Sequence, residues 1–83
     1  MEKTMLNPRI VEENEKERRM MYENLRALRQ EKGWSVRELS KISGIPEKSL
    51  ANIEEGKNFK VHYLIQLCRL YHIEVYKIFS PIK

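Results

Sequence analysis

Four side chains within residues 46–56 carry groups that proteins use to recognise DNA bases: Glu47, Lys48, Ala51 and Asn52. In a helix, residues three and four positions apart lie on the same side, so the four share one flank. Lys48 can donate to guanine O6 and N7, and Asn52 can pair with adenine N6 and N7. Ala51 can contact a thymine methyl group, and Glu47 can accept from cytosine N4. The alternative is an ordinary solvated helix surface, and the motif that surrounds these residues favours a base-contacting helix.

The sequence offers few residues for metal binding or catalysis. His62, His72 and Cys68 are the only nitrogen or sulfur candidates for a metal, and their spacing lacks the pairing typical of zinc sites. Cys68 stands on a predicted apolar helix face, which indicates a buried thiol and not a nucleophile. The sequence has no aspartate and no glycine-rich phosphate loop, and the adjacent Glu54 and Glu55 diverge on a helix. We therefore expect no enzyme, no metal site and no cofactor.

Two short helices joined by a tight turn are predicted to position the DNA-contacting flank. Ser35 caps the first helix, and Glu38 three residues later completes a capping box. Gly44 permits the sharp turn, Pro46 suits the first turn of the second helix, and Gly56 ends that helix. The side chains expected to face inward are Val36, Leu39, Ile42 and Ser43 in the first helix, and Leu50 and Ile53 in the second.

Three further helices are predicted around this pair. Residues 11–32 lack Gly and Pro and are rich in strong helix formers, with Met21, Leu25 and Leu28 at helical spacing. A helix over about residues 60–71 has a broad apolar face, formed by Val61, Leu64, Ile65, Leu67, Cys68 and Tyr71. Val75, Ile78 and Phe79 indicate a final short helix. The predicted fold is an all-α, compact domain of five helices.

Residues 1–20 are predicted to form a charged N-terminal extension, with the helix-turn-helix domain over residues 21–83. Five basic and five acidic side chains cancel within residues 1–20. Residues 11–19 offer almost no apolar surface to bury, so they are helical if the first helix extends backwards and disordered otherwise. Their composition favours extension. A solvated charged segment is favoured over an arm that reaches DNA or a second subunit.

Length and charge bound the class of protein. The 83 residues suffice for one small domain, and the whole formal net charge of +4 lies in residues 21–83. This charge modestly favours a polyanionic partner over an unpartnered basic surface. The single cysteine indicates a reducing compartment. With no apolar run near the ~20 residues of a membrane span and no signal-peptide pattern, we expect a cytoplasmic protein without membrane association.

The chain resembles the lambda-repressor-like helix-turn-helix domains, also called the xenobiotic-response-element family. The matching features are Trp34-Ser35, Glu38-Leu39, Gly44-Ile45, Leu50, Ile53-Glu54, Gly56-Lys57 and the run GKNFKVHYLIQLCRL. The resemblance covers about residues 21–79 and implies that the helix over residues 46–55 enters the DNA major groove. Val36 departs from a frequent glutamine and Pro46 from a frequent serine or threonine cap. Glu47 places a negative charge toward phosphates.

The same resemblance implies roles for residues around the groove. DNA backbone contacts are implied for Ser35, Arg37, Ser49, Lys57, Asn58 and Lys60. For the lysines, the alternative is ordinary surface charge. In the family, an arginine of the first helix meets the glutamate that closes the recognition helix. The corresponding residues here are Arg29 and Glu54, so we expect an ion pair that joins the two helices.

These patterns lead to one functional hypothesis and one alternative. The hypothesis is a sequence-specific, repressor-like transcriptional regulator that binds double-stranded DNA as a homodimer, with no small-molecule effector evident. The expected dimer surface, chosen for its apolar excess, comprises Tyr71, His72, Tyr76, Ile78 and Phe79. The alternative is a protein-interaction or antitoxin module on the same scaffold, which Val36 and Glu47 keep open.

Overall fold

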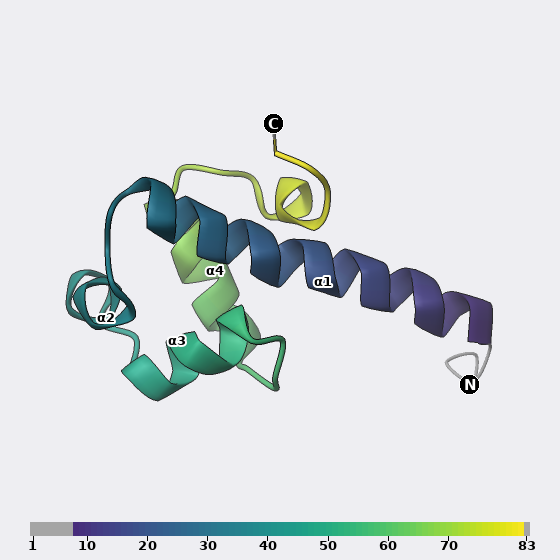
Figure 1. Ribbon diagram of the computed structural model, residues 1–83, viewed down its shortest axis with the longest axis horizontal. Helices are drawn as coiled ribbons and strands as arrows, with labels where there is room; N and C mark the ends of the chain where they lie inside the picture. Colours follow the sequence, from purple (N-terminus) through teal and green to yellow (C-terminus); the bar gives the residue numbers. More distant parts are fainter. Residues whose placement is uncertain (1–7, 83) are drawn as a thin grey trace.

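The computed structural model describes the backbone of residues 8–82 and the side chains of residues 15–82. Their regular structure consists of α1 (Pro8–Glu31), α2 (Val36–Ser43), α3 (Glu47–Glu54), α4 (Val61–Leu70) and the 3-10 helix η2 (Val75–Phe79) (Figure 1). The prediction of an all-α fold is confirmed for these residues. The prediction of five α-helices is not, since the last segment is a 3-10 helix of 5 residues.

Helix α1 packs against α3 and η2, and α2 packs against α3 and α4. Helix α1 is 24 residues long, and Gly33 at φ 76° turns the chain after its end. In Figure 1, α2, α3 and α4 lie on one side of α1, while η2 and the C-terminal segment lie on the other. Met21 and Leu25 are buried and Leu28 is partly buried, as their spacing predicts.

The predicted backward extension of the first helix is present, because α1 begins at Pro8. Residues 1–7 of the predicted N-terminal extension lie outside the described residues. The division of the chain at residue 20 stays a prediction, and α1 continues across it without interruption.

The turn between α2 and α3 follows from local signals in the sequence. The Ser35 hydroxyl accepts from the Glu38 amide at 3.0 Å, and the Glu38 carboxylate accepts from the Ser35 amide at 2.8 Å. Gly44 has φ 79° and donates its amide to the Ser40 carbonyl. Pro46 acts as the N-cap, so α3 begins at Glu47, one residue later than predicted. These contacts fix the path of the chain into α3.

One hydrophobic core joins all five helices. Its buried members are Met21, Leu25, Leu39, Ile45, Leu50, Ile53, Leu64, Leu67, Cys68, Tyr71 and Ile78. Leu39 of α2 and Leu50 and Ile53 of α3 are fully buried. These few large side chains hold α2 and α3 to each other and to the rest of the domain.

The sequence predicted more inward-facing residues on α2 and α4 than the structure buries. Ile42 is 48% exposed, Val61 is 65% exposed and Ile65 is 38% exposed. Leu39 is the one residue of α2 that is buried, because a helix of 8 residues contacts its neighbours along a narrow line. Val61 stands in the first turn of α4, ahead of the buried residues of that helix.

Part of the expected dimer surface belongs to the core of the protomer. Tyr71 is 8% exposed and Ile78 is fully buried, so the prediction that they face a partner is wrong for these two side chains. They are buried because the C-terminal segment folds back onto α1. Asn24 of α1 fixes this arrangement by donating Nδ2 to the carbonyls of Ile78 and Ser80, at 2.8 Å each. Tyr76 and His72 are exposed, and Phe79 is partly buried.

Candidate nucleic-acid interface

The outer flank of α3 is exposed at its start and partly covered further along. Helix α3 buries Leu50, Ile53 and Glu54, which lie on one side. Glu47 and Lys48 are exposed on the other side, and Ala51 and Asn52 are half-buried. In Figure 1 this helix forms the edge of the molecule farthest from η2. The four residues predicted to contact bases therefore share a flank that a DNA groove can reach.

The N-terminus of α2 offers a place for a phosphate group. Ser35 and Arg37 are exposed there, and the first amides of a helix lack partners within the helix. The capping box occupies the Glu38 amide with the Ser35 hydroxyl and the Ser35 amide with the Glu38 carboxylate. The amides of Val36 and Arg37 follow the cap and face the start of the helix.

The loop after α3 brings together four of the predicted DNA contacts. Ser49 and Asn52 of α3, and Asn58 and Lys60 of the loop, line one open groove of about 350 Å³. Its other lining residues are Phe59 and Tyr63, which the sequence did not indicate as site residues. Both are partly buried against the core, so they fix the position of the polar side chains beside them.

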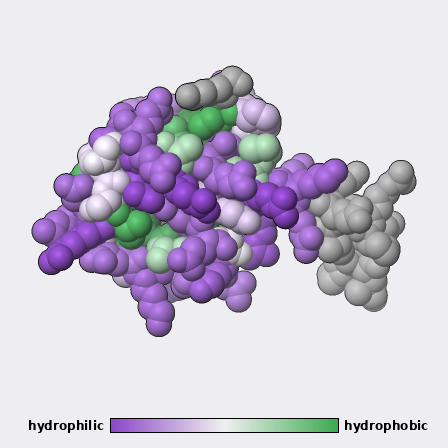
Figure 2. All heavy atoms as spheres, viewed as in Figure 1, coloured by the Kyte–Doolittle hydropathy of each residue, from purple (hydrophilic) through white to green (hydrophobic). Residues whose placement is uncertain are grey.

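Charge on the ten predicted DNA contacts is mostly positive. Arg37, Lys48, Lys57 and Lys60 are exposed cations, whereas Glu47 is the single anion of the set. Lys57 also pairs with Glu55 at 3.1 Å, and both side chains are more than half exposed. Figure 2 shows a mainly hydrophilic face with small, separate hydrophobic areas. A polar, net-positive surface suits the phosphate backbone of DNA.

Arg29 and Glu54 form a bidentate ion pair between α1 and α3. Arg29 Nε lies 2.8 Å from Glu54 Oε2, and Arg29 Nη2 lies 2.9 Å from Glu54 Oε1. Arg29 Nη1 also donates to the Trp34 carbonyl at 2.8 Å. Both side chains are largely buried, at 14% and 6% exposure. The hydrogen bond to Glu54 raises the pKa of Arg29, which favours the charged guanidinium.

Two more α1 arginines reach the end of α3, and sequence reasoning did not find them. Arg26 donates to the Glu54 carbonyl at 2.7 Å, and Arg18 donates to the Gly56 carbonyl at 2.7 Å. A backbone acceptor has no side chain that could signal the pairing. The only sequence signal is the spacing of Arg18, Tyr22 and Arg26, which places all three on one side of α1.

Of the residues considered for metal binding or catalysis, Cys68 and His72 line the groove between α4 and η2, and His62 does not. Cys68 is buried, and desolvation raises the pKa of its thiol, which disfavours the nucleophilic thiolate. His62 and His72 are exposed. Within the described part of the chain, no three His, Cys, Asp or Glu side chains are grouped so that they could hold a metal ion.

Comparison with known proteins agrees with this geometry. A family model described as Helix-turn-helix matches residues 25–78, more than half of the chain, and spans α2, α3 and α4. No curated protein and no solved structure matches the chain. Between residues 8 and 82, none of the helices has the length and apolar character that crossing a membrane requires. The chain belongs to the lambda-repressor-like helix-turn-helix family, whose members are DNA-binding domains.

Proposed function

We propose that this protein is a sequence-specific, repressor-like transcriptional regulator whose helix α3 enters the major groove of double-stranded DNA. The observation that carries the proposal is the bare polar flank of α3, with Glu47 and Lys48 exposed and Asn52 half-buried at the mouth of a groove. The opposite side of α3 is anchored by Leu50, Ile53 and the ion pair of Glu54. An anchored helix presents its side chains to bases with little loss of conformational entropy on binding.

The contacts divide into base recognition and backbone recognition. Lys48, Ala51, Asn52 and Glu47 contact base edges. The six residues that contact phosphates are Ser35, Arg37, Ser49, Lys57, Asn58 and Lys60. Glu47 accepts from a cytosine N4 amine, because a carboxylate near phosphates loses affinity unless it gains a base contact. Backbone contacts fix the register of α3 in the groove, so that these four side chains meet particular base pairs.

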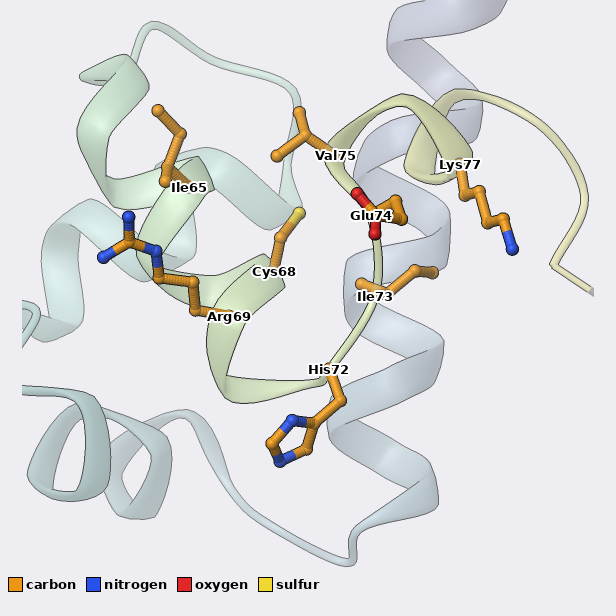
Figure 3. A pocket seen from close by; sticks show the side chains of 8 residues that line it. All are labelled: Ile65, Cys68, Arg69, His72, Ile73, Glu74, Val75 and Lys77. Atoms are coloured by element: carbon orange, nitrogen blue, oxygen red, sulfur yellow. The ribbon is translucent and has the colours of Figure 1, made fainter.

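A single domain of this size buries little surface on DNA, so the protein acts as a dimer on two half-sites. We propose that the dimer surface is the open groove of about 740 Å³ between α4 and η2 (Figure 3). It replaces the buried Tyr71 and Ile78 as the core of the interface. Ile65 and Val75, both more than a third exposed, extend into this region from opposite elements.

We propose a second copy of this chain as the occupant of the groove, because charges of both signs line it. Arg69 and Glu74 both line it, from α4 and from the segment before η2. In a two-fold interface each patch meets itself, so Glu74 of one protomer can face Arg69 of the other around the apolar centre. No residue of α2, α3 or the loop between α3 and α4 lines the groove, so dimerisation leaves both α3 flanks free.

Mobility shift with a short random-sequence duplex, at low and moderate salt, tests DNA binding. We expect binding that weakens steeply with salt, and Lys57→Ala or Lys60→Ala should reduce the slope by about 1. Lys32→Ala is the matched control, because Lys32 is an exposed cation just after α1 and is not among the ten residues assigned to DNA. Absence of binding at low salt contradicts the proposal and favours the protein-interaction module.

A further inference from the structure

Three arginines of α1 converge on the C-terminal end of α3. Arg29 binds the Glu54 carboxylate, Arg26 donates to the Glu54 carbonyl, and Arg18 donates to the Gly56 carbonyl. Arg18 and Gly56 are 38 positions apart in sequence, so the hydrogen bond ties the N-terminal half of α1 to the loop after α3. We name Arg18, Arg26 and Arg29 the arginine clamp.

Two arginines of the clamp add hydrogen bonds at this helix end. The last carbonyls of any helix lack partners within the helix. Here the Lys57 amide donates to the Asn52 carbonyl at 2.8 Å, and the Gly56 amide donates to the Ile53 carbonyl at 3.2 Å. These two bonds form a Schellman motif, in which Gly56 adopts φ 78°. Arg26 and Arg18 then satisfy the Glu54 and Gly56 carbonyls, which the motif leaves open.

Tyr22 fixes the distance between α1 and the loop. A Cβ atom on Gly56 would collide with the Tyr22 ring, so the two surfaces are in direct contact. The Arg26 guanidinium lies over the same ring, 6.0 Å from its centroid. The Tyr22 ring packs against Gly56 and Arg18 binds the Gly56 carbonyl, so two contacts hold the loop against α1.

We propose that Arg18 is a positioning residue that holds the loop after α3 in the form that places Lys57 and Lys60 against the DNA backbone. The inference rests on the proposed function, and it extends the DNA-binding unit beyond the family match, which begins at residue 25. Arg18 itself does not contact DNA in the proposed complex. It acts through the Gly56 carbonyl, one residue before Lys57.

A double-mutant cycle in DNA affinity tests the proposal. In the wild-type background, we expect Arg18→Ala to weaken binding to a random-sequence duplex roughly threefold to tenfold at low salt. In a Lys57→Ala, Lys60→Ala background the same change should have less than about a twofold effect, because the residues it positions are gone. Arg18→Lys keeps the charge and one donor, so it should restore most of the affinity.

Arg19→Ala is the matched control, since it removes an equal charge from the next position of α1. Among residues 15–82, Arg19 has no hydrogen bond to the loop, and its substitution should have the same small effect in both backgrounds. Equal effects of Arg18→Ala in both backgrounds would overturn the proposal, because they indicate a direct or long-range charge effect. If the wild-type protein does not bind duplex DNA, the proposed function is overturned instead.

Amide hydrogen exchange in the free protein tests the effect of Arg18 on the loop without DNA. Arg18→Ala should speed exchange of the Lys57 amide, which closes the Schellman motif, and leave the Leu39 amide of α2 unchanged. Faster exchange at both amides, or at neither, contradicts a local effect on the loop. Arg18 is exposed, so the variant keeps the core intact.

Discussion

The ion pair between Arg29 and Glu54 shows how one side-chain contact sets the position of α3. Glu54 closes α3, and its carboxylate is the buried charge of that helix. A buried charge left without its partner is strongly unfavourable. The pair therefore fixes the end of α3 against α1, and it was predictable because the family resemblance names both positions.

Arg29→Ala should lower the free energy of unfolding by about 3 kcal/mol, because it leaves Glu54 buried and unpaired. Urea unfolding followed by Trp34 fluorescence measures this loss. Lys57→Ala is the control, since it removes an exposed ion pair with Glu55 and should change stability by less than about 1 kcal/mol. Equal, small changes for both variants would contradict the structural role of the Arg29–Glu54 pair.

Tyr71 is a second residue with a measurable signature. Its ring stacks on Trp34 at 6.4 Å between centroids, and its buried hydroxyl has no hydrogen-bond partner among the described residues. Desolvation, followed by the Glu54 charge, raises the pKa of Tyr71 from 10.0 to about 12. The folded state thus holds this proton more tightly than the unfolded state.

Stability should therefore fall as the pH rises from about 10 to about 12, where the unfolded chain loses the Tyr71 proton and the folded chain retains it. The stabilisation is complete below the unfolded pKa, and the loss over this window is ~2 kcal/mol. Urea unfolding across this range, with Tyr71→Phe as the reference, isolates the contribution. We expect Tyr71→Phe to be as stable as wild type, or more stable, at neutral pH. Identical pH profiles for the two proteins would contradict the assigned shift.

The helix ends illustrate which features of an element are local and which are not. The capping box of α2 and the Gly44 turn were predicted because caps depend on residues a few positions apart. The exposure of Ile42, Val61 and Ile65 was not predictable, since helical spacing marks an apolar face but does not show how much of it a neighbour covers. The contacts of Arg18 and Arg26 with backbone carbonyls were missed because they depend on the placement of α1.

Gly56→Ala tests how tightly the end of α3 packs against α1. Gly56 and Gly33 both have positive φ, so alanine introduces backbone strain of about 1 kcal/mol at either site. Nothing lies within 4 Å of a Cβ at Gly33, whereas a Cβ at Gly56 meets the Tyr22 ring. Thermal unfolding should show that Gly56→Ala is the more destabilised variant by at least ~1 kcal/mol.

Replacement of Tyr22 by alanine should remove most of the difference between the two glycine variants, because the collision disappears and the backbone strain remains. If Gly56→Ala and Gly33→Ala are equally stable in the wild-type background, the ring moves aside freely. The contact between α1 and the loop then has no positioning role.

The protomer has two separate surfaces that differ in polarity and charge. The flank of α3, the N-terminus of α2 and the loop over residues 55–60 are polar and net positive. The groove between α4 and η2 combines Ile65 and Val75 with charges of both signs. The sequence indicated the first surface. Of the five residues that it assigned to the dimer, only His72 lines the groove. It included Tyr71 and Ile78 because the return of the C-terminal segment onto α1 has no local signal.

Val75→Glu should weaken self-association by at least about tenfold, because it places a carboxylate in the apolar centre of both copies of the interface. Sedimentation velocity over a concentration series measures the change. Val61→Glu makes the same substitution at a more exposed valine outside the groove and should leave association unchanged. A wild-type protein that stays monomeric at all concentrations, with and without duplex DNA, would contradict the proposed dimer.

The most direct measurement of DNA recognition through α3 is a titration of isotope-labelled protein with a duplex, followed by amide chemical-shift changes. The largest shifts should fall on residues 47–52, on Ser35 to Arg37 and on Lys57 to Lys60. Lys48→Ala and Asn52→Ala should keep the folded spectrum and reduce the preference for a selected sequence over a random one. Shifts concentrated on the second half of α4 and on η2, with α3 unchanged, would contradict the assignment of α3 as the recognition helix.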